Sequence, residues 1–383
     1  MDLLSSQRHL FDIPEEIAYF NCAYNSPQLK ATRAELERGA GSKSEPWKRT
    51  IASFFDDADT IRGLAAGLFG GDADGYAMIP AASYGLSTAA RAVEPQLRKG
   101  DRILVVADEF PSGVLPWMKT ARETGAVLTT VPSPVSGGWA EAILACVTDE
   151  VKVVALSTCH WTSGALIDLV PVAKVCRERN CVLVVDATQS LGAMPFAMEE
   201  IQPDFLVAAG YKWLLCPYGF GLMYVSQRWR NARPLEETWI SRDNARDFTS
   251  LADYSEGYLP GARRFDVGEA CVPTTLPGAI KALEQIGDWG VDRIAATLSE
   301  KNRQIVQAME GLGFAVPSPA ECCPHLFGAQ MPEECFGDPV SRLKQKGVFV
   351  SQRGNSIRIA PHLYVDERDM ERLVGGLREL VGS

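Results

Sequence analysis

The sequence has few histidines and no excess of positive charge, and both shortages exclude classes of function. Its 383 residues include only His9, His160, His325 and His362, whose spacing matches no metal-binding motif. Lysines and arginines number 38 against 48 aspartates and glutamates, so the formal net charge is −10. An acidic chain argues against a nucleic-acid partner and against binding to an anionic membrane surface. Local groups must therefore hold any anionic cofactor.

The N-terminal stretch also lacks the basic start and apolar run of a signal peptide. The ten cysteines are scattered, and Cys159, Cys181 and Cys216 lie in apolar, strand-like runs. These features predict reduced thiols in a cytoplasmic protein. The adjacent pair Cys322-Cys323 leaves a metal or redox element open as an alternative.

One apolar run, residues 205–225, is long enough to span a bilayer. It holds Lys212 near its centre, followed by the turn-forming sequence Pro-Tyr-Gly-Phe-Gly. A lysine in the middle of a membrane is costly, and that turn breaks a helix. We therefore expect two buried strands joined by a turn, with Lys212 as the lone charge and no membrane partner.

Short β-rich runs alternate with amphipathic segments through the first two thirds of the chain. The pattern predicts helices such as 116–124 and 170–179, and strands at 102–107, 127–131, 151–157, 182–186 and 205–208. Runs of valine and leucine with helical crossovers predict a mostly parallel sheet covered on both faces. Residues 219–225 are expected to form an antiparallel neighbour.

The chain is too long for one compact core, and its character changes near residue 290. Beyond that point the pattern predicts helices at 291–312, 339–346 and 366–381, with short strands in GVFVSQ and SIRIAPHLY. We predict an α/β fold with a large domain over 20–290 and a small α+β domain formed by 1–19 and 291–383. The polar, turn-rich segment 242–263 predicts a long functional loop.

Chemically capable side chains follow the ends of the predicted strands, where parallel sheets bind ligands. The crevice at these ends would gather Glu109-Phe110, His160-Trp161, Asp186 and Lys212. Pyridoxal 5′-phosphate (PLP) needs a lysine amine for its Schiff base and an aspartate to keep its pyridine nitrogen protonated. From spacing alone, a turn-capping Asp186 and a solvent-facing Lys212 fit equally well.

The segment VVDATQSLGAMPF, followed by DFLVAAGYKWLLCPYGFGLMYV, resembles the class V aminotransferase family of PLP enzymes. That family has fold type I and includes cysteine desulfurases, kynureninase and isopenicillin N epimerase. The resemblance covers nearly the whole chain. It implies PLP as a Schiff base on Lys212, Asp186 at the pyridine nitrogen and Gln189 at the phenolic oxygen. It also implies an amino-acid substrate and a homodimer.

The resemblance implies further contacts, and each has a simpler structural alternative. Ala82, Ser83 and Tyr84 match the family's phosphate loop, since a turn of small residues at a helix N-terminus offers N–H groups to an anion. Ser83 could equally be a plain N-cap. Phe110 falls at the position that stacks on the pyridine ring, although a strand-end phenylalanine is more often core.

Three other positions match the family in the same way. Trp161 lies where kynureninase-like members carry an aromatic residue near the cofactor. Tyr211 resembles the phosphate-binding neighbour of the lysine. Arg358 matches the arginine that binds the substrate carboxylate, for which a planar guanidinium is suited. The alternative for Arg358 is a solvent-facing strand arginine.

The sequence departs from the family at several points. The catalytic-cysteine loop of group II desulfurases is absent, because the chain runs directly from Gly354 to the Arg358 strand. Ala209 stands where relatives place a phosphate-binding serine. Glu269 replaces a threonine that reaches the neighbouring subunit's phosphate, so either Arg263 or Arg264 compensates or the contact is lost.

We therefore predict a PLP-dependent enzyme that acts on an amino acid as an aminotransferase or a carbon–sulfur lyase. An isopenicillin N epimerase-like epimerase and a non-catalytic PLP-fold protein remain alternatives. A nicotinamide dehydrogenase would need a glycine-rich turn after the first strand of a βαβ unit. The closest glycine pair, Gly219 and Gly221, lies between two predicted strands instead.

Overall fold

A seven-stranded sheet forms the centre of the computed structural model, which describes residues 2–134, 138–318, 321–335 and 337–382. The sheet order is β2-β8-β7-β6-β5-β3-β4, and β8 runs antiparallel to both of its neighbours. The strands are β2 (Tyr76–Ile79), β3 (Arg102–Val106), β4 (Val127–Val131), β5 (Val151–Ser157), β6 (Val182–Asp186), β7 (Phe205–Ala209) and β8 (Gly221–Val225). The predicted mostly parallel sheet, including its antiparallel member, is confirmed.

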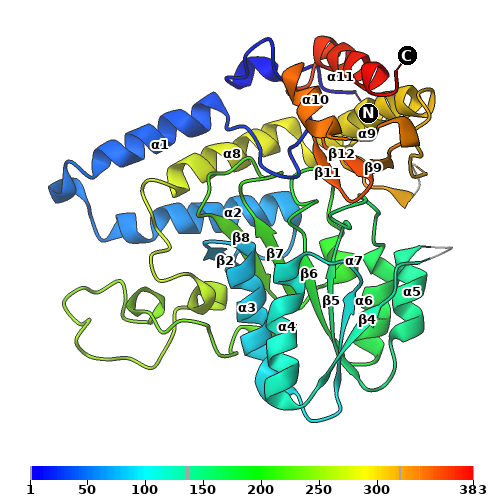
Figure 1. Ribbon diagram of the computed structural model, residues 1–383. Helices are drawn as coiled ribbons and strands as arrows, with labels where there is room; N and C mark the ends of the chain where they lie inside the picture. Colours follow the sequence, from blue (N-terminus) through cyan, green and yellow to red (C-terminus); the bar gives the residue numbers. More distant parts are fainter. Residues whose placement is uncertain (1, 135–137, 319–320, 336, 383) are drawn as a thin grey trace.

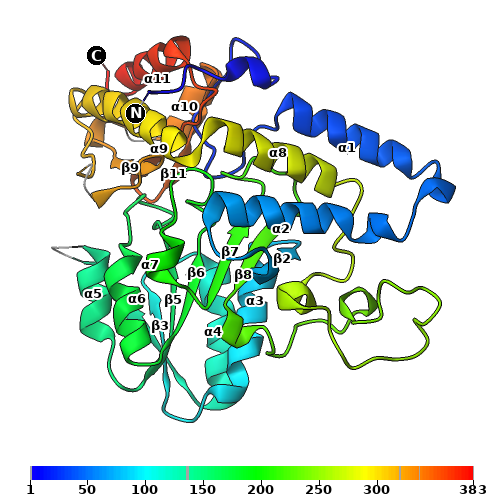
Figure 2. The same ribbon diagram turned by 180° about the vertical axis from the view of Figure 1, so that it is seen from behind.

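Helices cover both faces of this sheet, as Figures 1 and 2 show from opposite sides. Alternate residues of β3 enter different cores: Ile103 and Val105 pack with one cluster, and Leu104 and Val106 with the other. The first cluster lies under α3 (Ala82–Val93) and α4 (Pro111–Thr124). The second lies under α2 (Asp56–Phe69), α5 (Trp139–Cys146), α6 (Leu169–Glu178), α7 (Met198–Ile201) and α8 (Leu276–Trp289).

A smaller α+β part follows α8 and packs above the carboxyl end of the sheet in Figure 1. It has an antiparallel sheet in the order β11-β12-β9 and a short parallel pair, β1-β10. Its strands are β9 (Phe327–Gln330), β10 (Val348–Phe349), β11 (Ser351–Arg353) and β12 (Ser356–Ile359), and its helices are α9 (Val291–Glu310), α10 (Pro339–Gln345) and α11 (Glu367–Leu380). The N-terminal strand β1 (Ala18–Tyr19) brings the chain start onto this part, and α1 (Lys30–Ser42) then packs along α8.

The apolar run 205–225 forms β7, a turn-containing connection over residues 210–220, and β8, so the two predicted buried strands are present. Gly210 is required in the turn, because a Cβ atom there would lie 2.7 Å from the Phe220 carbonyl oxygen. Leu215 adopts a left-handed conformation with φ of 55°, which is uncommon for a residue with a side chain. Among the described helices, none has the length and apolar character needed to cross a membrane. The turn carries Lys212 at the carboxyl end of β7.

Segment 242–263 is a long loop that lies to the side of the sheet in Figure 1. Ion pairs anchor it: Arg246 and Arg263 both bind Asp59 of α2, and Arg263 also binds Asp74, which precedes β2. The predicted loop is therefore present and anchored, and its functional role stays a prediction.

Candidate active site

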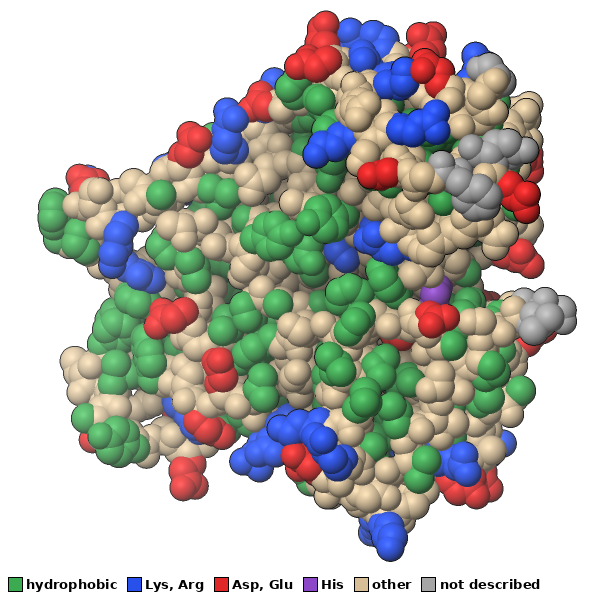
Figure 3. Space-filling model, in the orientation of Figure 1, with side chains coloured by type: hydrophobic (Ala, Val, Ile, Leu, Met, Phe, Trp, Pro, Cys, Tyr) green, Lys and Arg blue, Asp and Glu red, His purple; other side chains and the backbone are tan. Residues whose placement is uncertain are grey.

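A pocket opens where β3, β5, β6 and β7 end, with about 620 Å³ of empty space including its mouth. Figure 3 shows the molecule in the orientation of Figure 1. Hydrophobic side chains extend across the middle of the visible surface, and lysine and arginine side chains lie between the upper and lower parts of the molecule. Eight of the predicted site residues line the pocket: Ala82, Ser83, Phe110, Trp161, Asp186, Gln189, Tyr211 and Lys212. Tyr84 and Arg358 lie outside this lining, and His160 is buried behind it.

Lys212 is only 9% exposed, so the solvent-facing alternative for this lysine is wrong. The pKa of its amine is lowered to about 8, mainly because burial disfavours the ammonium form; the Asp186 carboxylate opposes this shift and the guanidinium of Arg358 adds to it. The N-terminal segment fixes the backbone here, since the amide and hydroxyl of Ser26 donate to the Tyr211 carbonyl at 3.0 and 3.1 Å. A large fraction of the amine is therefore neutral near pH 8 and able to act as a nucleophile.

Asp186 ends β6 at the floor of the pocket. Its Oδ1 accepts from the Thr188 N–H at 2.9 Å, which is the turn-capping contact that the sequence allowed. Burial raises the pKa of the carboxyl, whereas the Thr188 donor and the Lys212 amine lower it. Capping and ligand binding coexist, because the same side chain also lines the pocket.

Gln189 is held by two neighbours. Its Nε2 donates to the Ala23 carbonyl at 3.0 Å, and its Oε1 accepts from the Trp213 indole at 3.0 Å. An amide nitrogen carries two N–H groups, so one remains for an acceptor in the pocket. The side chain is thus fixed before any ligand binds.

The N-terminus of α3 points its first turn at the pocket, where Ala81, Ala82 and Ser83 line the wall. The first N–H groups of a helix have no partner within the helix, and the helix dipole adds positive potential there. Ser83 makes no N-capping bond, because Ala81 is the N-cap residue. Tyr84 instead packs against the core under α3, close to Glu236.

Phe110 and Trp161 form an aromatic wall. Their ring centroids are 5.4 Å apart at 83°, and Phe110 is 43% exposed, which excludes the core alternative. The Trp161 indole donates to the Asp108 carbonyl at 2.8 Å, and the Lys212 Nζ lies 5.8 Å from the Phe110 centroid. Tyr211 stacks on Tyr218 with centroids 4.2 Å apart.

Arg358 is 1% exposed, so the solvent-facing alternative is wrong here too. Its Nε donates to the Ser351 hydroxyl at 3.1 Å, and one terminal nitrogen donates to the Trp161 carbonyl at 2.8 Å. The other terminal nitrogen has no hydrogen-bond partner among the described residues. Burial lowers the pKa of this guanidinium to about 10, and Arg353 adds to the effect. An unsatisfied, buried guanidinium nitrogen near Lys212 is suited to a carboxylate.

Several residues of the site were given no role from the sequence, although the strand-end pattern placed Glu109 in the crevice. Glu109 lines the pocket, and its carboxylate accepts from the Ser157 hydroxyl and the Phe110 N–H, both at 2.7 Å. Burial raises the pKa of Glu109, and the charge of Asp186 adds to the shift. Its strand-end position was the available signal. Thr188 and Cys159 also line the pocket, but apolar context gave them no distinguishing pattern.

The residues considered for the cross-subunit contact lie elsewhere in the described chain. Glu269 is exposed and outside the pocket lining. Arg263 is engaged with Asp59 and Asp74, and Arg264 donates to Asn231 and covers the Tyr258 ring at 4.3 Å. Neither arginine faces this chain's own pocket.

The donor set fits PLP at each of its reactive ends. A buried amine is available for the aldehyde, a carboxylate for the pyridine nitrogen, and a helix N-terminus for the phosphate. The unsatisfied nitrogen of Arg358 adds a partner for the carboxylate of a bound amino acid. The chemistry of the described residues therefore agrees with the cofactor that the resemblance implies.

Comparison with known proteins gives an independent result. The family model described as aminotransferase class-V matches residues 27–373. An uncharacterized aminotransferase of Bacillus subtilis, YcbU, is 25% identical over 87% of this chain and 85% of its own length. The isopenicillin N epimerase of Streptomyces clavuligerus is 22% identical over 75% of this chain and 76% of its own length.

A solved structure is similar over the full chain. The apo structure of a cysteine desulfurase from Thermococcus onnurineus NA1 superposes with a TM-score of 0.86 and 18% identity. The match covers 100% of this chain and 99% of the other. At this identity the similarity establishes a shared fold.

Proposed function

The chain belongs to the class V aminotransferase family of PLP-dependent enzymes, and from that premise we propose that it acts on an α-amino acid as an aminotransferase or a carbon–sulfur lyase. The observation that carries this proposal is the buried amine of Lys212, with a pKa of about 8, in one pocket with Asp186. A neutral amine at that position serves as the anchor for the cofactor aldehyde, as a Schiff base.

Each group of the pocket then has a distinct task. Bound PLP supplies an electron sink that weakens the bonds at the amino acid's Cα. Asp186 would hold a proton at the pyridine nitrogen, and Gln189 would donate to the phenolic oxygen. The N-terminus of α3, with Ser83, would hold the phosphate, and Phe110 would contact the ring.

Substrate binding falls to the smaller α+β part. Arg358 holds the α-carboxylate in one orientation, because its fork is already fixed by Ser351 and Trp161. The Lys212 amine then takes the Cα proton, since its pKa lies close to neutral pH. This proton transfer is common to transamination, elimination and epimerisation.

A persulfide-forming desulfurase is disfavoured by the site. The turn between β11 and β12 is Gly354-Asn355 and carries no cysteine. Cys22 lies near Lys212, but it is fully buried, and burial raises the pKa of its thiol strongly. A protonated, enclosed thiol is a poor nucleophile.

We further propose two domains, 20–290 and 1–19 with 291–383, and a cytoplasmic homodimer. The separate β11-β12-β9 sheet supports the division, and free thiols such as Cys159 and Cys216 support a reducing compartment. Exposed aromatic side chains, Tyr24 and Tyr218, support a self-interface near the pocket. Sedimentation equilibrium tests the dimer, which a single-chain mass at micromolar concentration would contradict.

The deciding experiment is a product analysis. Purified holoprotein is incubated with a panel of amino acids and assayed for keto acid, for pyruvate with sulfide, and for inverted stereochemistry. Lys212→Ala is the control and should lose all three activities. Borohydride should fix the cofactor to the Lys212 peptide. A colourless protein that gains no cofactor absorbance with added PLP contradicts the proposal, and inverted stereochemistry alone would establish the epimerase.

A further inference from the structure

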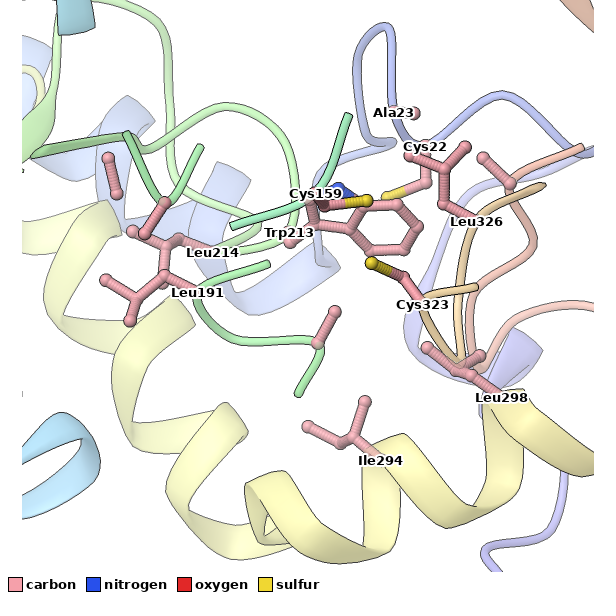
Figure 4. Packing of buried hydrophobic residues seen from close by; sticks show 14 of the residues in the cluster. Cys22, Ala23, Cys159, Leu191, Trp213, Leu214, Ile294, Leu298, Cys323 and Leu326 are labelled. Atoms are coloured by element: carbon pink, nitrogen blue, oxygen red, sulfur yellow. The ribbon is translucent and has the colours of Figure 1, made fainter. Parts of the chain in front are cut away.

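Three potential metal ligands meet behind the wall of the pocket. Cys159, Cys323 and His325 each place one ligand atom within 4.8 Å of the other two. All three are buried, with exposed fractions of 0%, 3% and 0%. Cys159 follows β5, whereas Cys323 and His325 precede β9, so the tertiary structure alone brings them together. Figure 4 shows Cys159 and Cys323 close to Trp213.

His325 is oriented as metal-binding histidines are. Its Nε2 is hydrogen-bonded to the Gln189 carbonyl, and its ring meets Trp213 edge-on with centroids 4.4 Å apart. Its Nδ1 has no hydrogen-bond partner among the described residues. A bond from one ring nitrogen to a backbone carbonyl fixes the tautomer and leaves the lone pair of the other nitrogen for a ligand.

The ring is also neutral, as a ligand must be. The bond from Nε2 to the Gln189 carbonyl places the proton of the neutral ring on Nε2, so Nδ1 carries none. The two thiols would each release a proton to solvent on binding, and the resulting charges would offset those of a divalent ion. Without an ion, the buried Nδ1 is an unsatisfied polar atom beside two sulfur atoms.

We propose that Cys159, Cys323 and His325 form a three-ligand site for Zn²⁺ or a similarly soft divalent ion. Zinc binds cysteine sulfur at about 2.3 Å and histidine nitrogen at about 2.0–2.1 Å. Ligand atoms within 4.8 Å of one another reach this geometry through small side-chain movements. The sulfur and imidazole donors select against Mg²⁺ and Ca²⁺, which prefer oxygen.

The site has an entry path and a defined effect on its surroundings. Cys159 also lines the cofactor pocket, so an ion can enter from there, and the fourth coordination position can face it. Gln189 is linked to the site through the bond from His325 to its carbonyl. A bound ion would therefore join the end of β5 to the segment before β9 and hold Gln189 in place.

The test uses protein purified in a reductant free of chelating thiols, dialysed against Zn²⁺ alone while it is cofactor-free and then loaded with PLP. We expect one zinc per chain, and zinc X-ray absorption should report two sulfur atoms at about 2.3 Å and one imidazole nitrogen at about 2.0 Å. Cys159→Ser and Cys323→Ser should each reduce the sulfur count to one and weaken binding by more than about 100-fold, beyond the cost of an outer-shell change. Cys216→Ser, at a buried thiol elsewhere, is the matched control.

Far-ultraviolet circular dichroism and cofactor absorbance show whether each variant is folded, and using two separate cysteine variants means that one unstable protein does not end the test. Failure to bind zinc in the wild type, all-oxygen coordination, or equal loss in Cys216→Ser overturns the site. A disulfide between Cys159 and Cys323 that forms in place of zinc uptake also overturns it. None of these readouts depends on turnover, so the result is independent of the proposed reaction.

Discussion

Among single residues, Lys212 shows how strongly the surroundings of a side chain can change its pKa. The side chain is buried in the pocket, and Asp186 is the largest of the influences that raise its pKa. Desolvation dominates, because water is replaced by groups that solvate an ammonium ion poorly. The amine is therefore charged below about pH 8 and neutral above it.

This sign gives a pH prediction. In cofactor-free protein, the rate of PLP attachment should rise as the pH increases through about 8 and then level, because only the neutral amine attacks an aldehyde. Stopped-flow absorbance measures the profile. Asp186→Asn removes the charge that raises the pKa and should move the midpoint to lower pH. A midpoint near that of a free lysine in the wild type would contradict the buried amine.

Arg358 supports a second residue-scale prediction. Arg358→Gln should raise KM for the amino-acid substrate by roughly 10- to 100-fold, with a smaller effect on kcat, because a charge-assisted bond contributes about 1.5–3 kcal/mol. Steady-state kinetics separates the two constants. Arg358→Lys keeps the charge without the fork and should recover part of the loss. An unchanged KM in folded Arg358→Gln would contradict the proposal that Arg358 binds the substrate carboxylate.

At the scale of elements, α3 is the part that decides anion binding. Gly85 lets the helix approach the sheet, because a Cβ atom there would lie 2.8 Å from Ile79 and 2.9 Å from Val207. That close packing sets the N-terminus at the pocket wall. The helix therefore delivers its free N–H groups through backbone geometry, with little demand on side-chain identity.

The element-scale prediction adds a negative charge at that terminus. Ser83→Asp should weaken PLP affinity roughly 10- to 100-fold, because the carboxylate repels the phosphate and competes for the N–H groups. Pyridoxal, which lacks the phosphate, should bind as before. Ser87→Asp, one turn further along α3, is the matched control. Equilibrium dialysis measures the affinity for both ligands. If Ser83→Asp weakened the binding of PLP and of pyridoxal equally, the result would contradict a phosphate site at this helix terminus.

Elements were predictable where the local pattern was strong. Strands β4, β5 and β6 begin and end at the predicted residues, because each is a run of β-branched and leucine side chains between turn signals. The run GVFVSQ was predicted as one strand but forms two. Residues of β10 pair with the N-terminal β1, and residues of β11 pair with β12, so different partners divide the run.

Helices α1 and α2 were not predicted. Each contains two glycines, Gly39 and Gly41 in α1 and Gly63 and Gly67 in α2, which lower intrinsic helix stability. Both pack on α8, and a Cβ at Gly39 would lie 1.8 Å from the Pro273 carbonyl oxygen. Tertiary contact therefore stabilises these helices where local propensity is weak.

At the scale of the whole molecule, a buried ion pair joins distant segments. Arg62 of α2 binds Asp266 and the Tyr76 carbonyl, and Asp266 also accepts from the Met78 N–H at 2.7 Å. The two residues are 2% and 7% exposed. The pair thus ties α2, β2 and the segment after the long loop into one unit.

Removing one partner should destabilise the fold strongly. Arg62→Met leaves Asp266 buried without its counter-charge and should cost about 3–5 kcal/mol. The double variant with Asp266→Asn should recover part of that loss. Thermal and urea midpoints measure the change, with exposed Arg303→Met as a control expected to differ little from the wild type. If Arg62→Met unfolded at the same temperature and urea concentration as the wild type, the result would contradict a stabilising role for this ion pair.

Local sequence pattern was sufficient to predict the alternation of strands and helices, a sheet covered on both faces, and a lone lysine in an apolar run. These are local properties, since side-chain periodicity and turn residues act over a few positions. It also carried the family resemblance, on Asp186, Gln189 and Lys212. The family model that matches residues 27–373 confirms that resemblance.

The tertiary structure alone decided which side chains meet. It buried Arg358 against the Trp161 carbonyl and brought Cys159 close to Cys323 and His325. It also placed Ser26 where its hydroxyl donates to the backbone next to Lys212. Such contacts join residues far apart in the chain, and crossover connections and sheet order set them, not local preference. For Lys212 the consequence is specific: its place in the apolar run was visible in the sequence, but its lowered pKa comes from groups that only the fold assembles.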